Sequence, residues 1–215
     1  MRVDNRKKKK SIKNCILNHV NNNLREYIIL IILFLIGVVA GVIFINNVNE
    51  SQKQELQTYI TGFVQSLKGD YQIDKTKFLK TSIIENVKLA IILWFVSSTV
   101  IGIFLVYGII IFKGFCIGYT MASVLATLGT GKGICFAITS LLLQNILFIP
   151  SILALGVSGM KLYKSIMKDK RRENIKIEIY RHTIFSIMIL VFFIISSFIE
   201  TYISSPLLMN TAKYL

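Results

Sequence analysis

The amino-acid sequence predicts an all-α protein, a polytopic membrane helix bundle of about five transmembrane helices. Of its 215 residues, 53% are apolar. Uncharged stretches reach 18 residues or more, the length at which a helix crosses a bilayer. Almost all of the charge lies between these stretches, whereas a soluble domain of this length would interrupt its apolar runs with charge. We therefore expect a multi-pass protein of the cell membrane.

The chain begins with a basic segment, 1–26, which is predicted to lie in the cytoplasm. The run 27–45 follows, with 19 residues and no charge. As a helix it would cover about 28 Å, enough to cross the hydrocarbon core. The run is too long for a signal peptide, and no clear cleavage site follows it. We interpret 27–45 as an uncleaved first span, and 27–215 as a single membrane domain.

The loop 46–86 is predicted to lie on the extracytoplasmic side and to contain an amphipathic helix. Apolar residues recur there at helical spacing, and Gln, Thr, Lys and Glu occupy the opposite face. The apolar stripe consists of Leu56, Tyr59, Ile60, Phe63, Val64 and Leu67. Such a stripe either lies on the membrane or packs over the bundle, or it is a docking surface for an extracytoplasmic partner.

A stretch of 42 residues after this loop has only two charges, Lys88 and Lys113. One helix of that length would be about 63 Å long, twice a bilayer, so the chain must turn. We expect the turn at Lys113 and Gly114, because Lys is costly at the bilayer centre and Gly permits a tight turn. The second span is then 88–112. A short third span, 114–128, either crosses fully or is re-entrant.

Two further spans are predicted at 134–160 and 183–203, separated by a polybasic loop at 161–181. The distribution of Lys and Arg indicates the orientation, because cytoplasmic segments carry an excess of both. With the N-terminus inside, 17 basic residues lie in inside segments and 8 in outside segments. The inverted topology would place both polybasic tracts outside. We therefore expect the N-terminus inside and the C-terminus outside.

Polar residues within the later spans are candidates for function. Gln144 and Asn145 either bond to neighbouring helices or line a path for a solute or ion. Pro150 cannot donate a backbone hydrogen bond, so it predicts a local kink. Glu200, the only acidic residue in any predicted span, is expected at the outer interface, where a carboxylate costs little.

No catalytic, cofactor-binding or metal-binding pattern is present. The segment GTGKG at 129–133 lacks the other residues of a phosphate-binding loop. Two His and three Cys have no partners at metal-ligand spacing, and no catalytic triad order is found. The net charge of +14 clusters beside apolar spans, which favours contact with anionic lipid of the inner leaflet over nucleic acid. The sequence therefore predicts a protein that is not an enzyme.

Four stretches in register resemble the stage II sporulation protein M family of spore-forming bacteria. They are SQKQEL at 51–56, FKGFCIGYT at 112–120, QN at 144–145 with IP at 149–150, and IETYISSP at 199–206. The resemblance covers nearly the whole chain and agrees in length and in the order of the spans.

The resemblance implies a role in engulfment of the forespore. It implies a non-catalytic scaffold that localises peptidoglycan-degrading enzymes, stage II sporulation proteins D and P, at the septal membrane of the mother cell. The docking surface would then be the loop 46–86 or the outer ends of the spans. The alternative function is a permease-like or channel subunit that moves a small solute, which Gln144, Asn145 and the short third span favour.

Overall fold

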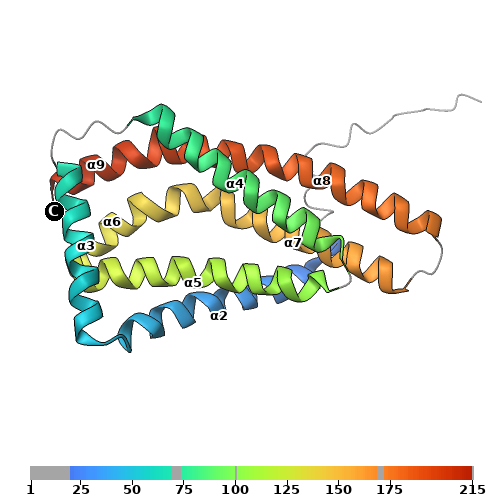
Figure 1. The fold of residues 1–215 in the computed structure, drawn as a ribbon, viewed down its shortest axis with the longest axis horizontal. Helices are drawn as coiled ribbons and strands as arrows, with labels where there is room; N and C mark the ends of the chain where they lie inside the picture. Colours follow the sequence, from blue (N-terminus) through green and yellow to red (C-terminus); the bar gives the residue numbers. More distant parts are fainter. Residues whose placement is uncertain (1–19, 69–73, 100, 169–171, 215) are drawn as a thin grey trace, which may run out of the picture.

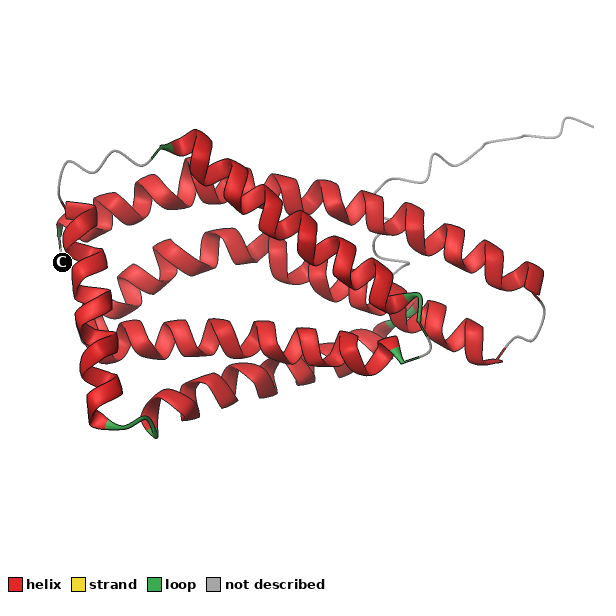
Figure 2. Cartoon of the chain, in the orientation of Figure 1, coloured by secondary structure: helices red, strands yellow, loops and turns green. Residues whose placement is uncertain are grey.

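The computed structural model describes residues 20–68, 74–99, 101–168 and 172–214, so most of the basic segment 1–26 lies outside the described residues. All secondary structure within the described ranges is helical (Figure 2). In chain order the elements are α2 (Leu24–Asn46), α3 (Glu50–Lys68), α4 (Lys75–Ser97), α5 (Gly102–Leu128), α6 (Thr130–Ala137), η1 (Ile138–Leu142), α7 (Leu143–Lys168), α8 (Arg172–Ile199), η2 (Glu200–Ser204) and α9 (Ser205–Lys213). The two η elements are π-helical. The predicted all-α fold is confirmed.

Five legs run along the long axis of the molecule: α2, α4, α5, α6–η1–α7 and α8–η2–α9 (Figure 1). Helix α3 lies across them at one end, beside the α5–α6 turn and α9. We call this the α3 end. The other end, which we call the basic end, holds the start of α2, the end of α4 with the start of α5, and the end of α7 with the start of α8. The start of α2 and the helix ends that flank the polybasic loop therefore lie at the same end of the bundle.

Among the described residues, four helical stretches are long and apolar enough to cross a membrane. They are Leu24–Asn46, Gly102–Leu128, Leu143–Met167 and Ile175–Lys213. The fifth leg, α4, is not one of these four, because its charged residues lie in its first part and its apolar run is confined to its second. Its first half carries several Lys residues and begins at Asp74, whose carboxylate accepts from the amides of Thr76 and Lys77 at 3.0 Å each.

The predicted turn at Lys113 and Gly114 is wrong. Both residues lie in the middle of α5, and the chain turns instead between α4 and α5, at 98–101. The second and third spans predicted at 88–112 and 114–128 are correspondingly displaced. Helix α5 has 27 residues, about 40 Å of helix, so the short third span does not exist.

Lys113 and Gly114 have other roles within α5. The ammonium of Lys113 lies 5.5 Å from the centre of the Phe148 ring, a favourable cation–π contact that lessens the cost of a charge at this depth. Gly114 faces α2, where a Cβ atom would lie 2.2 Å from the carbonyl oxygen of Phe34. The glycine therefore serves a close helix contact rather than a turn.

The last two legs are longer than predicted. The span expected at 134–160 belongs to a helical leg that runs from Thr130 to Lys168, and the one expected at 183–203 to a leg that runs from Arg172 to Lys213. Helix α7 continues through Pro150, and the visible bend of its leg lies near η1 (Figure 1). A π-helical turn is a known cause of bends, so η1 accounts for the bend.

Apolar side chains from all five legs form the main core. Its fully buried members include Leu30, Leu93, Ile110, Leu155 and Phe193. The Phe193 ring stacks on Phe148 with centroids 5.0 Å apart, which joins α8 to α7. This core holds the legs together on the basic-end side of the polar side chains described below.

Candidate functional site: a polar network inside the bundle

Polar side chains from α4, α7, α8 and η2 meet inside the bundle, and we call them the polar network. The Ser82 hydroxyl on α4 donates to the carboxylate of Glu200 on η2. The side-chain amide of Gln144 on α7 lies beside the same carboxylate. One turn along α4, Asn86 Nδ2 donates to Ser197 Oγ at 2.8 Å. The network therefore joins three legs through side chains that are at least half-buried.

Helical spacing explains why these residues converge. Ser82 and Asn86 are four residues apart and lie on one face of α4. Ser196, Glu200 and Ser204 repeat at the same interval on the last leg, within a run that is otherwise strongly apolar. Such a repeat places a polar stripe on one side of a helix, and the bundle turns that stripe inward.

The two π-helical segments contact each other. Ser204 Oγ in η2 donates to the carbonyl oxygen of Thr139 in η1 at 2.7 Å. Nearby, Ser196 Oγ donates to the carbonyl oxygen of Gln144 at 3.1 Å. A π-turn disturbs the regular ladder of backbone bonds, and hydroxyls from the neighbouring leg satisfy the carbonyls there. The same irregularity occurs in both legs at the level where they touch.

Gln144 and Asn145 point to different partners. Gln144 faces the carboxylate of Glu200, whereas Asn145 Nδ2 donates to Leu141 O of its own leg at 2.7 Å. Of the two predicted polar residues, one therefore bridges legs and the other stabilises the π-helical segment. Pro150 lies five residues after Asn145 along α7 and is exposed, outside the network.

Glu200 lies within the network rather than at a helix end. The chain continues as helix from Glu200 to Lys213, a rise of about 20 Å. Among the described residues no Lys or Arg forms an ion pair with its carboxylate. The hydroxyl of the next residue, Thr201, is 1% exposed and without a hydrogen-bond partner in the described part of the chain. A carboxylate in this setting can bind a hydrogen-bond donor or a cation, but the network contains no nucleophile paired with a base.

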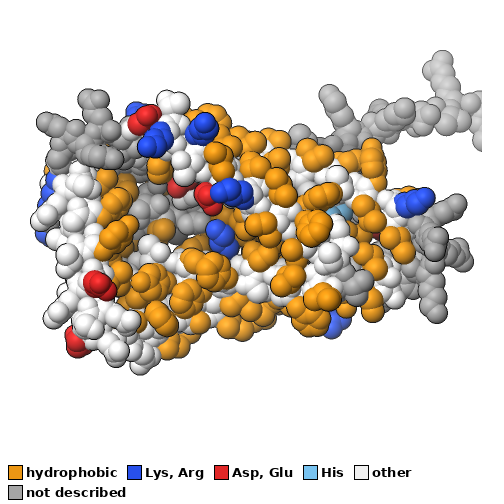
Figure 3. Space-filling view, viewed as in Figure 1, with side chains coloured by type: hydrophobic (Ala, Val, Ile, Leu, Met, Phe, Trp, Pro, Cys, Tyr) orange, Lys and Arg blue, Asp and Glu red, His pale blue; other side chains and the backbone are white. Residues whose placement is uncertain are grey.

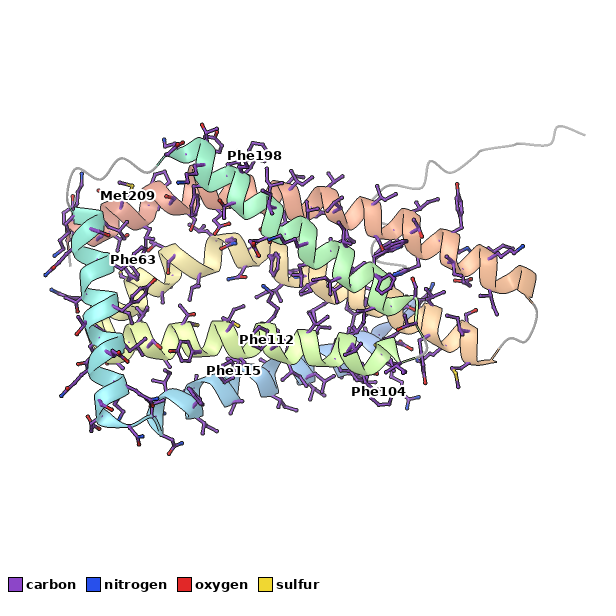
Figure 4. All side chains as sticks on the ribbon, in the orientation of Figure 1. Phe63, Phe104, Phe112, Phe115, Phe198 and Met209 are labelled. Atoms are coloured by element: carbon purple, nitrogen blue, oxygen red, sulfur yellow. The ribbon has the colours of Figure 1, made fainter. Side chains whose placement is uncertain are left out.

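Helix α3 is held against the α3 end by part of the predicted apolar stripe. Ile60, Val64 and Leu67 are buried and pack on Val124, Phe136 and Ala212. Phe63 points toward α6, where its ring meets Phe136 edge-on with centroids 6.5 Å apart (Figure 4). Leu56 is half-buried, and only Tyr59, at 74% exposed, projects freely. Most of the stripe is therefore used for packing within the chain.

The surface of the legs differs from the surface of α3. Apolar side chains cover much of the visible face of the legs, while α3 presents mainly uncharged polar groups outward (Figure 3). Charged side chains interrupt the apolar band where α4 crosses it (Figure 3). The charged residues of α4 include the ion pair between Lys88 and Glu85, at 3.0 Å.

The model of the family described as stage II sporulation protein M matches residues 30–205, about four fifths of the chain. The chain belongs to the stage II sporulation protein M family. It is therefore a sporulation membrane protein of a family that is not known as catalytic. Comparisons with curated proteins and with solved structures give no match.

The region matched to stage II sporulation protein M runs from α2 into α9, so it contains both the polar network and α3. Sequence reasoning missed Ser82, Asn86 and the serines of α8 and η2. Their four-residue repeat in an apolar run was the available signal. It also missed the glycine pairs Gly37–Gly41 and Gly114–Gly118, whose spacing is typical of close helix contacts in membranes.

Proposed function

We propose that this protein is a non-catalytic membrane anchor that assembles and localises peptidoglycan-degrading enzymes during engulfment of the forespore. Its partners would be stage II sporulation proteins D and P at the septal membrane of the mother cell. Membership of the stage II sporulation protein M family supports this role. The observation that carries it is α3, a helix fixed crosswise on one end of the bundle with its polar face outward.

The orientation that this function needs places the α3 end outside and the basic end in the cytoplasm. The charge distribution supports it. Once Lys113 and Lys88 are left out because they lie in the middle of α5 and α4, 16 basic residues remain in inside segments against 7 outside. Peptidoglycan lies on the outer face of the membrane, so α3 would face the substrate of the partner enzymes.

A groove beside α3 is the surface that we assign to the partner. It has a volume of about 500 Å³ and lies where α2, α3 and α5 meet. Its walls include Phe44, Leu56, Tyr59 and Tyr119. Aromatic side chains that border a groove with polar edges are typical of protein interfaces. Tyr59, at 74% exposed, is the most exposed member of this group and is expected to be the anchor.

The docking role of Tyr59 can be tested by Tyr59→Glu in sporulating cells. A charge at the rim of the groove should disrupt an apolar contact and reduce co-purification of the D and P proteins from detergent extracts by at least about tenfold, the effect of losing one interface hot spot. Membrane insertion should be unchanged, because Tyr59 makes no buried contact. Recovery of the two partners by quantitative mass spectrometry is the measurement.

Thr61→Glu is the matched control, since Thr61 is also exposed on α3 but does not line the groove. A second variant, Val64→Asp, buries a charge where Val64 is 5% exposed and should detach α3 from the bundle. Normal recovery of both partners with Tyr59→Glu and with Val64→Asp would show that α3 does not dock them.

The polar network favours a second candidate function, a path for a small solute or ion. The observation is the Glu200 carboxylate, which accepts from Ser82 inside the bundle and lies beside Gln144. Intramembrane carboxylates of this kind commonly mark substrate or ion pathways. If Glu200→Gln abolished solute flux in vesicles while leaving partner recovery normal, the path would replace the anchor as the main function. Equal flux before and after the change would exclude it.

A further inference from the structure

A pocket of about 240 Å³ lies between α7 and α8 at the basic end. Ser158, Lys161 and Leu162 line it from α7, and Arg181 and His182 from α8. Its walls are therefore mixed, with cationic and hydrogen-bonding groups beside apolar ones. Neither the anchor function nor the polar network uses this pocket.

The base of the pocket is a buried polar pair. His182 is 2% exposed and Ser158 is 8% exposed. The Nδ1 atom of His182 lies 2.9 Å from the hydroxyl oxygen of Ser158. Burying an imidazole and a hydroxyl costs free energy unless they are hydrogen-bonded, and here the two groups bond to each other. The pair joins the facing sides of α7 and α8, and the two cationic side chains line the same pocket.

The rim of the pocket carries one net positive charge. Lys161 and Arg181 are both exposed, and Glu178 lines the pocket with them. Arg181 Nη1 bonds to Glu178 Oε1 at 2.7 Å. A guanidinium has five N–H donors, so Arg181 retains donors for a further acceptor. A ligand with a single negative charge would neutralise the net charge of the rim.

The pocket lies at the level where the apolar spans begin. Lys161 is the first charged residue after the uncharged stretch 133–160, which runs through α6, η1 and most of α7. Arg181 and His182 immediately precede the uncharged stretch 183–199 of α8. Trp94 of α4 reaches the same level, where its Nε1 donates to Thr183 Oγ1 at 3.1 Å. Tryptophan is enriched at the membrane–water interface, which agrees with a headgroup depth.

We propose that this pocket binds the phosphodiester headgroup of an anionic phospholipid. A phosphodiester has one negative charge, which matches the net charge of the rim. Lys161 and Arg181 donate to its oxygens, and Leu162 borders the glycerol carbons. Basic pockets between membrane helices on the cytoplasmic side have the chemistry for such headgroups. The bound lipid then bridges α7 and α8 next to their connection.

Trp94 allows a direct test, because it is the only tryptophan of the chain and bonds to the residue after His182. The full chain in neutral detergent micelles is titrated with brominated phosphatidylglycerol or brominated phosphatidylcholine, and quenching of tryptophan fluorescence is measured. Phosphatidylglycerol should quench at the lower concentration. Lys161→Gln and Arg181→Gln should each lower the affinity for phosphatidylglycerol about five-fold, the effect of one cation at the membrane surface.

The controls distinguish binding in the pocket from non-specific attraction of the lipid to the basic end. Arg25→Gln and Lys176→Gln each remove an exposed cation at the basic end outside the pocket, and they should leave quenching unchanged. Lys161→Arg keeps the charge and should keep the affinity. Equal quenching by both lipids, an equal loss in the control variants, or the same loss with Lys161→Arg would overturn the proposal. Displacement of the brominated lipid by free glycerol phosphate as effectively as by phosphatidylglycerol would also overturn it, because the site would then bind a soluble anion.

Discussion

Two helix contacts in the bundle are held together by different interactions. One is the contact between α2 and α5, and the other is the contact between α4 and the last two legs. The first is built from glycines: Cβ atoms at Gly37, Gly41 and Gly118 would lie 2.1–2.3 Å from carbonyl oxygens of the facing helix. The second is built from polar side chains, with Asn86 bonded to Ser197 and Ser82 bonded to Glu200. The first depends on shape, and the second depends on hydrogen bonds.

The difference between the two contacts indicates which helices of the bundle can rearrange. Backbones in close contact have no alternative arrangement once a methyl group is added, because packed interiors do not deform continuously. Hydrogen bonds between hydroxyls, amides and a carboxylate can exchange partners at a small cost. We therefore expect α2 and α5 to behave as one rigid unit, and rearrangement during partner binding to occur where α4, η1 and η2 meet.

The largest effect is expected from Gly114→Ala at the glycine contact. The new Cβ would lie 2.2 Å from Phe34 O, a backbone atom that cannot move without separating α2 from α5. The loss in free energy of unfolding should be at least about 3 kcal/mol, measured in mixed detergent micelles. Gly108→Ala on the same helix is the control, because its Cβ would meet nothing within 4 Å. Equal stability of the two variants would show that the close contact is not required.

A smaller effect is expected from Asn86→Ala in the polar contact. The change removes the bonds to Ser197 Oγ and to Phe193 O, while Ser197 keeps a bond to its own helix. The loss should be about 1 kcal/mol, as for other side-chain hydrogen bonds between membrane helices. Thr81→Ala, whose hydroxyl is exposed and bonds only within α4, provides the reference. A loss as large as that for Gly114→Ala would remove the distinction between the two contacts.

The smallest effect is expected from Ser204→Ala, where η2 meets η1. Loss of the bond to Thr139 O should cost about 0.6 kcal/mol. The more sensitive measurement is amide hydrogen exchange, which should increase in 138–142 because η1 opens more readily once its bond to η2 is lost. Ser66→Ala on α3 is the control, since that hydroxyl bonds to Phe63 O of its own helix. Unchanged exchange in η1 would mean that the two π-helical segments are not coupled.

The first span and the crosswise helix were accessible to sequence reasoning because each depends on a local pattern. The uncharged run 27–45 lies within α2, and the apolar periodicity of 56–67 lies within α3. The α4–α5 turn was not accessible. Its residues, Ser98 to Ile101, carry neither Gly nor charge, whereas Lys113 and Gly114 have the composition of a turn. Their actual partners, Phe148 and the backbone at Phe34, come from other helices.

The candidate site divides in the same way. Gln144 and Glu200 were identified singly, because a polar residue in an apolar run is visible in the sequence. Their proximity to each other and to Ser82 was not, since they lie on three legs separated by up to 118 residues. His182 is the clearest case: it lies in a basic segment, yet the pairing of α7 with α8 buries it against Ser158.

The sequence by itself determined the membrane class, the helical content, the charge bias between the ends and the resemblance to the stage II sporulation protein M family. These follow from hydropathy, periodicity and short motifs, which are properties of neighbouring residues. Only the tertiary structure decided where α4 ends, which glycines bring α2 against α5 and which polar groups form the network. The physical reason is that an apolar run of sufficient length is compatible with several turn positions. Backbone contact and inter-helix hydrogen bonds, formed between distant residues, select one of them.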